Sequence, residues 1–367
     1  MTSRERVSAA FAHRRPDRTP MFEYVLLPPL ADRFLGHPYA GDDGTFRTLA
    51  REQGWDAAVR QNALDRLALA EALGHDFLYA WPPPGPEACR ADGSAGTDAG
   101  AESQAEAPDD PVERLRARNR REAEAGPEPP DAAVALFARL REEIRRRGPD
   151  LPMLAPAYAH GVWTDTDLME TMVLAPDVAG EHFRLATERM LRLVARYAEI
   201  GVDVVGVGGD FAGNRPLISP DAYRRSIVPE VRRVADAVRA AGMLSVNASD
   251  GDLWPVIGDF LEGCGVDGYL EIDMQAGMDL GRLKRAWGGR FTLFGNMDCG
   301  TLLSFGTTEA IRTATRACLE AGREGSPGGH VFSASNAITA SVPPGNYLAM
   351  VGEYRRFFGL PQLRIGG

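Results

Sequence analysis

Residues 176–210 read PDVAGEHFRLATERMLRLVARYAEIGVDVVGVGGD and contain one complete helix-to-strand unit. The apolar residues of 176–200, at Phe183, Ala186, Met190, Leu193, Val194 and Tyr197, fall on one face, which predicts an amphipathic helix. Gly201 is placed to end that helix. The β-branched run 203–207 that follows predicts a short buried strand.

The same unit recurs along the chain. Short apolar runs that predict strands lie at 21–25, 75–79, 153–158, 203–207, 244–247, 268–272, 291–295 and 330–333. Helical patterns separate most of them, and one such helix is expected to start at Ser219-Pro220-Asp221 and end at Gly242. Eight strand–helix units predict an α/β fold, a closed parallel (β/α)8 TIM barrel. The alternative is an open doubly wound sheet, but no G-x-G-x-x-G or P-loop motif supports it.

One stretch of the 367 residues differs in composition from the rest. Residues 82–131 are rich in Pro, Gly, Ala, Ser, Asp and Glu, which predicts a flexible insertion after the second strand. We expect its centre, 91–110, to be disordered and 111–124 to form a short charged helix; a lid over an active site is the alternative. With that insertion inside it, 1–367 is expected to be a single barrel domain.

The net charge and the cysteine content exclude several classes of partner and of structure. The formal net charge is −10 and the sequence pI is about 5.2, which argues against nucleic acid or an anionic membrane surface as a partner. No apolar run is long enough to span a bilayer, and the first residues lack the apolar region of a signal peptide. The four cysteines form no C-x-x-C pair. We therefore expect a cytoplasmic protein without disulfides that acts on a small molecule.

In a parallel barrel, the polar residues that end the strands converge at one mouth, where active sites lie. The residues read off at the strand ends are Glu23, Tyr24, Tyr79, Trp81, Tyr158, His160, Asp210, Asn247, Asp250, Glu271, Asn296, Asp298 and Asn336, and all of these except Glu23 and Tyr79 are taken as candidate site residues. Asp252 and Asp273 are instead expected to cap turns. Among the histidines His160 alone is a plausible acid–base residue, with a buried hydrogen-bonded role as the alternative.

Several sequence blocks resemble the uroporphyrinogen decarboxylase superfamily, which includes heme-pathway decarboxylases and zinc-dependent methyltransferases that serve corrinoid proteins. The blocks are 2–7 with 15–20, 201–203 leading to Gly209-Asp210, 217–220, 249–252, 265–268, 276–280, 295–298 and 342–346. The resemblance spans nearly the whole chain outside 82–131. It implies a TIM barrel and a homodimer, and it does not separate the branches of the superfamily.

The chain departs from both branches of that superfamily. At the positions where the methyltransferases hold zinc with His, Cys and Cys, the resemblance places Ala248, Asp250 and Asn336, so we expect no comparable zinc site. A harder cation on Asp210, Asp250 and Glu271 is the alternative. The segment 24–30, where the heme-pathway enzymes carry an arginine that grips substrate carboxylates, has no arginine before Arg33.

Three functions remain open. The first is a cofactor-free lyase, a decarboxylase of a small polar substrate other than uroporphyrinogen. Asp210 or Asp250 would stabilise a developing cation, Asn247, Asn296 and Asn336 would orient the substrate, and Tyr158 or His160 would handle the proton. The second is a one-carbon or methyl transferase with a different metal set and a corrinoid partner. The third is a ligand-binding barrel without catalysis.

Overall fold

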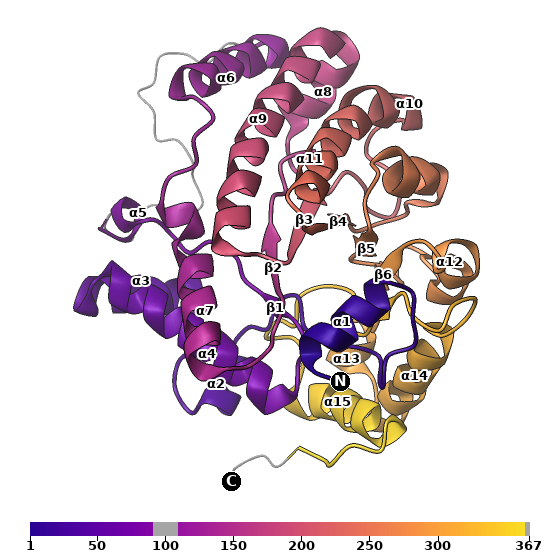
Figure 1. Cartoon of the computed structure of the whole chain (residues 1–367). Helices are drawn as coiled ribbons and strands as arrows, with labels where there is room; N and C mark the ends of the chain where they lie inside the picture. The colour runs from indigo at the N-terminus through magenta and orange to yellow at the C-terminus, as the bar shows by residue number, and fades with distance from the viewer. Residues whose placement is uncertain (91–108, 364–367) are drawn as a thin grey trace.

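The computed structural model describes residues 1–90 and 109–363. Within them, seven parallel strands pair in chain order, with helices arranged around them (Figure 1). The strands are β1 (Leu78–Tyr79), β2 (Met153–Pro156), β3 (Val204–Gly208), β4 (Leu244–Ala248), β5 (Gly268–Leu270), β6 (Thr292–Phe294) and β7 (His330–Val331). In the longest register, Val204 lies opposite Leu244 and Gly208 opposite Ala248. Because neighbouring strands are parallel, each pair needs a crossover, and helices lie in most of these connections.

The helices precede, connect and follow the strands. They are α1 (Ser3–Phe11), α2 (Leu30–Leu35), α3 (Asp43–Gln53), α4 (Trp55–Leu73), α5 (Pro86–Arg90), α6 (Pro111–Ala125), α7 (Ala132–Arg147), α8 (Thr166–Leu174), α9 (Pro176–Ile200), α10 (Pro220–Ala222), α11 (Val228–Ala240), α12 (Leu280–Trp287), α13 (Leu302–Phe305), α14 (Thr308–Ala321) and α15 (Pro344–Phe357). Shorter π-helical turns lie at Tyr223–Ile227 and Asp259–Gly263, and a 3₁₀ turn at Trp254–Val256. None of the described helices has the length and apolar character needed to cross a membrane.

The first expected strand, 21–25, is much shorter than its apolar run suggested. Met21 forms an isolated parallel bridge with Phe332, just beyond β7. The Phe22 amide donates to the Phe332 carbonyl at 3.1 Å, and the Asp76 amide, just before β1, donates to the Met21 carbonyl at 2.7 Å. The segment around Met21 therefore bonds to both edges of the seven-stranded sheet and takes the eighth position. The TIM barrel predicted from the sequence is confirmed.

Alternation along the strands divides the core into two parts. Val204 points into the barrel, where it shares a cluster with Phe22 and Phe294. Val205 and Val207 point outward into the larger cluster between the sheet and the helices. The helix α1 contributes Val7 and Phe11 to the inner cluster, and the ring centroids of Phe11 and Phe294 lie 5.8 Å apart. The inner cluster thus fills the barrel interior with side chains, and a ligand that contacts the strands is expected at their ends.

The helix signals behave as expected. The Ser219 hydroxyl accepts a hydrogen bond from the Ala222 amide at 3.1 Å, as an N-cap residue does. Gly201 follows α9 in the left-handed region, with a φ of 87°. These local signals fix where α9 and α10 stop and start, and so where the strands between them begin.

The expected insertion, 82–131, contains ordered helices in its described part. The predicted helix at 111–124 is α6, which packs against α8 and α9. Leu115 is buried, and the Asn119 side-chain amide donates to the Val178 carbonyl at 3.0 Å. The helix α5 also lies inside the expected insertion, before its centre. Most of that centre, 91–108 of the expected 91–110, lies outside the described residues.

Candidate active site

Three strand ends are joined by hydrogen bonds at the mouth of the barrel. Asp210 follows β3, Asp250 follows β4, and Asn336 follows β7. The Asp250 amide donates to Oδ1 of Asp210 at 3.0 Å, and Nδ2 of Asn336 donates to Oδ2 of Asp250 at 2.5 Å. Residues separated by up to 126 positions in sequence therefore form one polar site, as the parallel topology requires.

Glu271 adds a third carboxyl in an unusual backbone conformation. It follows β5 with a φ of 74°, in the left-handed region that residues other than glycine rarely adopt. Its side chain is buried, and burial together with the charges of Asp250 and Asp210 raises its pKa well above the ordinary value. Backbone strain of this kind costs roughly 1–3 kcal/mol and concentrates at functional sites.

The carboxyls of the mouth resist ionisation. Burial, followed by the charges of Asp210 and Asp273, raises the pKa of Asp250 to about 7. Burial also raises the pKa of Asp210. Because these groups are half-buried and close together, they cannot all carry a charge without a compensating positive group. Asp250 can therefore hold or release a proton near neutral pH.

Three tyrosines lie on the same side of the barrel as Glu271. The Tyr79 hydroxyl donates to the Tyr24 hydroxyl at 3.3 Å, and the two ring centroids lie 4.3 Å apart. Tyr158 lies near Tyr79 and Glu271, and after burial their charges raise its pKa further. Its hydroxyl occupies the space that a Cβ on Gly206 would need, 2.3 Å away, so the glycine makes room for this ring.

We refer to Tyr24, Tyr79, Tyr158, Asp210, Asp250, Glu271 and Asn336 as the mouth cluster. Trp81 lies at its edge, with its ring stacked on Tyr158 at a centroid distance of 6.3 Å, and it is 53% exposed. Of the sequence candidates, the structure thus brings together Tyr24, Trp81, Tyr158, Asp210, Asp250, Glu271 and Asn336.

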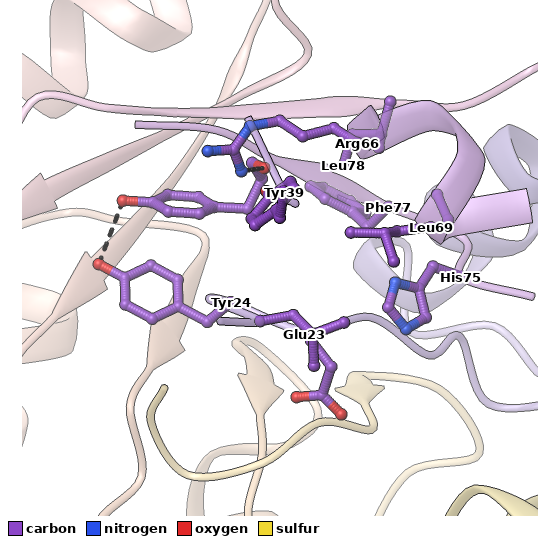
Figure 2. Close-up of a pocket in the computed structure, with 11 residues that line it drawn as sticks. Glu23, Tyr24, Tyr39, Arg66, Leu69, His75, Phe77 and Leu78 are labelled. Atoms are coloured by element: carbon purple, nitrogen blue, oxygen red, sulfur yellow. Dashed lines mark hydrogen bonds between the residues drawn. The ribbon is translucent and has the colours of Figure 1, made fainter. Parts of the chain in front are cut away.

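A small pocket adjoins the mouth cluster between α4 and the Met21 segment. Tyr24, Tyr79, Arg66, Glu23 and His75 are among its lining residues. The side chains of Glu23 and Tyr24 point in different directions (Figure 2). Glu23 accepts a hydrogen bond from the Ala334 amide at 3.2 Å, and burial raises its pKa to about 8. Glu23 is therefore held by the Ala334 amide and points away from Tyr24, and we do not count it in the mouth cluster.

His160 lies apart from the mouth cluster. Its ring is buried against Phe183 of α9, and Nε2 lies 2.8 Å from the Thr187 hydroxyl. Burial lowers its pKa to about 3, so the imidazole is neutral at physiological pH. This is the buried, hydrogen-bonded arrangement that was the alternative to an acid–base role, and the structure offers no contact through which His160 could replace Asp250.

The remaining candidates also point elsewhere. Nδ2 of Asn247 donates to the Phe260 carbonyl at 3.0 Å, in the layer outside the barrel. Asn296 and Asp298 line an apolar cavity of about 400 Å³ beside α12, α13 and α14. The Asp298 carboxylate accepts from the amides of Thr301 and Leu302 and so holds the start of α13. Strand-end position alone did not reveal that these side chains turn away from the mouth.

Tyr79, one of the strand-end residues expected at the mouth, ends β1 and joins the mouth cluster. Phe77, just before β1, and Tyr79 both belong to the inner cluster, so both side chains face the barrel interior. The turn-capping roles expected for Asp252 and Asp273 agree with their hydrogen bonds to the amides of Trp254 and Gln275.

The donor set does not fit the zinc site of the superfamily's methyltransferases. Asp250 and Asn336, at two of the expected ligand positions, do lie together, but the Asn336 amide group is hydrogen-bonded directly to the Asp250 carboxylate. Ala248 supplies no donor at the third position. Within 1–90 and 109–363, no three His, Cys, Asp or Glu side chains are placed to hold a metal ion, the Asp210, Asp250 and Glu271 set included.

A parallel barrel with a polar, partly exposed cluster at the carboxyl ends of its strands defines a TIM-barrel protein with the architecture of an enzyme. The particular family follows from its sequence. Residues 152–357, more than half of the chain, match the family model described as uroporphyrinogen decarboxylase (URO-D). The chain belongs to this family.

Individual relatives are distant. The uroporphyrinogen decarboxylase of Coxiella burnetii is 26% identical over 246 residues, which cover 62% of this chain and 64% of that protein. The enzyme of the same name from Burkholderia thailandensis is 31% identical over 134 residues, which cover 36% of this chain and 34% of that protein. A solved methyltransferase from Methanosarcina mazei shares the fold over 98% of this chain and 99% of its own, with a TM-score of 0.69 and 19% identity.

Proposed function

We propose that this chain is a decarboxylase of the URO-D family that acts without a bound cofactor on a small polar substrate other than uroporphyrinogen. The observation that carries the proposal is the mouth cluster, with three neighbouring carboxyls at the strand ends and a direct hydrogen bond between Asp250 and Asn336. A carboxyl-rich, partly buried site suits a reaction that develops positive charge in the substrate.

The residues support the following sequence of events. A proton is delivered to the substrate carbon that bears the leaving carboxylate, and a positive charge develops on the adjacent group. The carbon–carbon bond then breaks, its electrons neutralise that charge, and carbon dioxide leaves. Asp250 is the proton carrier, because its pKa of about 7 lets it hold and give up a proton at neutral pH. Asp210 stabilises the cation by its charge, and Glu271, whose pKa is raised well above the ordinary value, contacts the substrate as a hydrogen-bonding carboxyl. Asn336 orients Asp250.

Uroporphyrinogen itself is a poor fit to these residues. Its many carboxylates would meet Asp210, Asp250 and Glu271, which are acids. Arg33, the first arginine after Tyr24, lies in α2 and its side chain is exposed. A substrate with fewer negative charges suits the mouth cluster better.

Methyl transfer with a corrinoid partner is the second candidate, since the Methanosarcina mazei protein that shares the fold is described as a methyltransferase. It predicts a bound metal, so elemental analysis of the purified chain separates it from the decarboxylase. A ligand-binding barrel without catalysis is the third. The homodimer and the cytoplasmic location stay predictions.

The test is release of carbon dioxide from a panel of small carboxylic acids, with Asp210→Asn and Asp250→Asn as variants. On a substrate that the unmodified chain turns over, we expect each variant to lose roughly 10²–10⁴-fold in kcat, the range of a general acid or base. Asp221→Asn, an exposed acid on α10 whose carboxylate pairs with Arg224, is the matched control and should keep full activity. Full turnover by both mouth variants would refute the assigned roles.

A further inference from the structure

We propose that the substrate of this site carries a positively charged nitrogen, an ammonium or alkylated ammonium group, which binds between the carboxylates and the tyrosine rings of the mouth cluster. The inference rests on the proposed function insofar as it names the substrate class for the same site. It concerns binding, however, and it can be tested apart from decarboxylation.

No cation of the described residues compensates the negative charge of the three mouth carboxyls. Asp210, Asp250 and Glu271 lie together, yet in the part of the chain that the structure describes none of them takes part in an ion pair. Asp210 and Asp250 accept hydrogen bonds from an uncharged backbone amide and an uncharged side-chain amide. Neutral donors compensate a buried negative charge only in part. A cationic ligand would complete the compensation.

Aromatic rings lie beside the mouth carboxyls. Tyr24 and Tyr79 lie 4.3 Å apart between ring centroids, and Trp81 stacks on Tyr158. Aromatic faces attract cations, and organic ammonium groups are commonly held by several such rings. The Tyr158 hydroxyl oxygen is buried without a hydrogen-bond partner in the described structure. An N–H donor on a ligand would supply that partner.

The surroundings of the cluster add negative charge. Asp273 is a further acid near Asp250, and its charge contributes to the raised pKa of Asp250. The neighbouring Tyr269 hydroxyl stays neutral, because burial and the charges of these carboxyls raise its pKa well above the ordinary value. Arg66 is the guanidinium beside the tyrosines, but Nε is hydrogen-bonded to Asn62 and Nη1 to the Tyr79 carbonyl (Figure 2). It is therefore already engaged and contributes no ion pair to the carboxylates.

The cluster lies at the edge of the buried core. Tyr24, Tyr158, Asp210 and Asp250 are each partly exposed as residues, whereas the Tyr158 hydroxyl oxygen itself is buried. The three carboxyls do not form a metal-binding group in the described structure, which favours an organic cation over a metal ion. An ammonium group tolerates irregular donor geometry because it interacts mainly through charge and through the ring faces.

The test compares matched pairs of cations and neutral analogues. Choline is paired with 3,3-dimethylbutan-1-ol, in which carbon replaces the charged nitrogen, and ethanolamine with propan-1-ol. Binding to the full chain is measured by isothermal titration calorimetry. We expect at least one cation to bind roughly tenfold more tightly than its neutral partner, a typical cation–π and charge contribution. If both cations bind no more tightly than their neutral analogues, the proposal is overturned.

Variants locate the site once a cation binds. Asp250→Asn should weaken binding roughly tenfold. Tyr158→Leu should weaken it more than Tyr158→Phe, because phenylalanine keeps a ring face. Asp221→Asn should bind like the unmodified chain. Equal binding by Asp250→Asn and the unmodified chain would place the cation elsewhere and refute the proposal.

The two proposals fail in different ways. If the chain binds cations selectively but releases carbon dioxide from no cationic carboxylic acid, the cationic ligand class stands and the decarboxylase proposal is refuted. Release of carbon dioxide from neutral acids, with no preference for cations in the calorimetry, would do the reverse.

Discussion

Buried acids at the two ends of the barrel have different partners. At the amino-terminal end, Asp76 is fully buried and lies between two arginines. Arg6 donates to its Oδ1 at 2.6 Å, and Arg18 donates to Oδ2 at 2.5 Å and to Oδ1 at 2.9 Å. Ser3 and the Met21 amide add further donors. Every oxygen of this carboxylate has charged partners.

At the carboxyl-terminal end, the three mouth carboxyls have no charged partner among residues 1–90 and 109–363. Asp210 and Asp250 accept hydrogen bonds from a backbone amide and from the side-chain amide of Asn336. This difference indicates that the amino-terminal acid stabilises the fold, whereas the carboxyl-terminal acids serve ligand binding. The Asp76 network fastens α1 and the Met21 segment to the barrel, whereas the mouth cluster tolerates repulsion that a ligand can relieve.

The largest effect is expected from breaking the Asp76 network. Asp76→Asn would remove a fully buried carboxylate from Arg6, which keeps Asp17 as a partner, and from the partly buried Arg18, and we expect a loss of about 3–5 kcal/mol in the free energy of unfolding. Urea denaturation measures it. Asp150→Asn removes a partner of Arg4 whose side chain is 43% exposed, and should cost less than about 1 kcal/mol. Equal losses would show that burial does not distinguish the two acids.

The mouth should respond in the opposite direction to Asp250→Asn. The pKa of Asp250 is about 7 in the folded chain against an ordinary 3.8, so the folded state holds a proton that the unfolded state has released. Below about pH 4 both states hold the proton, and Asp250 does not lower the free energy of unfolding. As the pH rises from about 4 to about 7, only the unfolded state releases the proton, and the free energy of unfolding falls by roughly 2–4 kcal/mol.

The asparagine variant should lack this part of the pH dependence and should be more stable than the unmodified chain at neutral pH. Denaturation of both proteins across that pH range measures the difference. A variant that is less stable at neutral pH would indicate that Asp250 contributes to stability as the Asp76 network does.

A smaller effect is expected from the strained backbone of Glu271. Glycine adopts its φ of 74° freely, whereas glutamine removes only the charge. We expect Glu271→Gly to be more stable than Glu271→Gln by about 1 kcal/mol in urea denaturation. Both variants should lose affinity for a cation. If the glycine variant is no more stable than the glutamine variant, the conformation costs little and does not mark the site.

Local patterns predicted the barrel because each strand and helix has its own signal. The amphipathic face of α9, the N-cap at Ser219 and Gly201 at the end of α9 all act over a few residues, and the structure places them as expected. The Met21 strand is shorter than predicted because its pairing depends on Phe332 and Asp76, which are distant in sequence.

Strand-end positions predicted which residues could reach the mouth, because parallel strands bring their carboxyl ends together. They could not predict direction. His160 and Asn247 turn into the helix layer, where Thr187 and the Phe260 carbonyl hold them. Asp298 turns toward the start of α13. Each of these choices depends on a hydrogen-bond partner from another element.

The net charge and the absence of family zinc ligands at 248, 250 and 336 can be read from the chain alone, since they depend only on which residues are present. The assembly of Asp210, Asp250, Glu271 and three tyrosines into one cluster, with no arginine in an ion pair with the three carboxyls in the described structure, was decided by tertiary packing. The reason is that charge compensation and burial act between side chains brought together from different strands, and a linear pattern does not contain those distances.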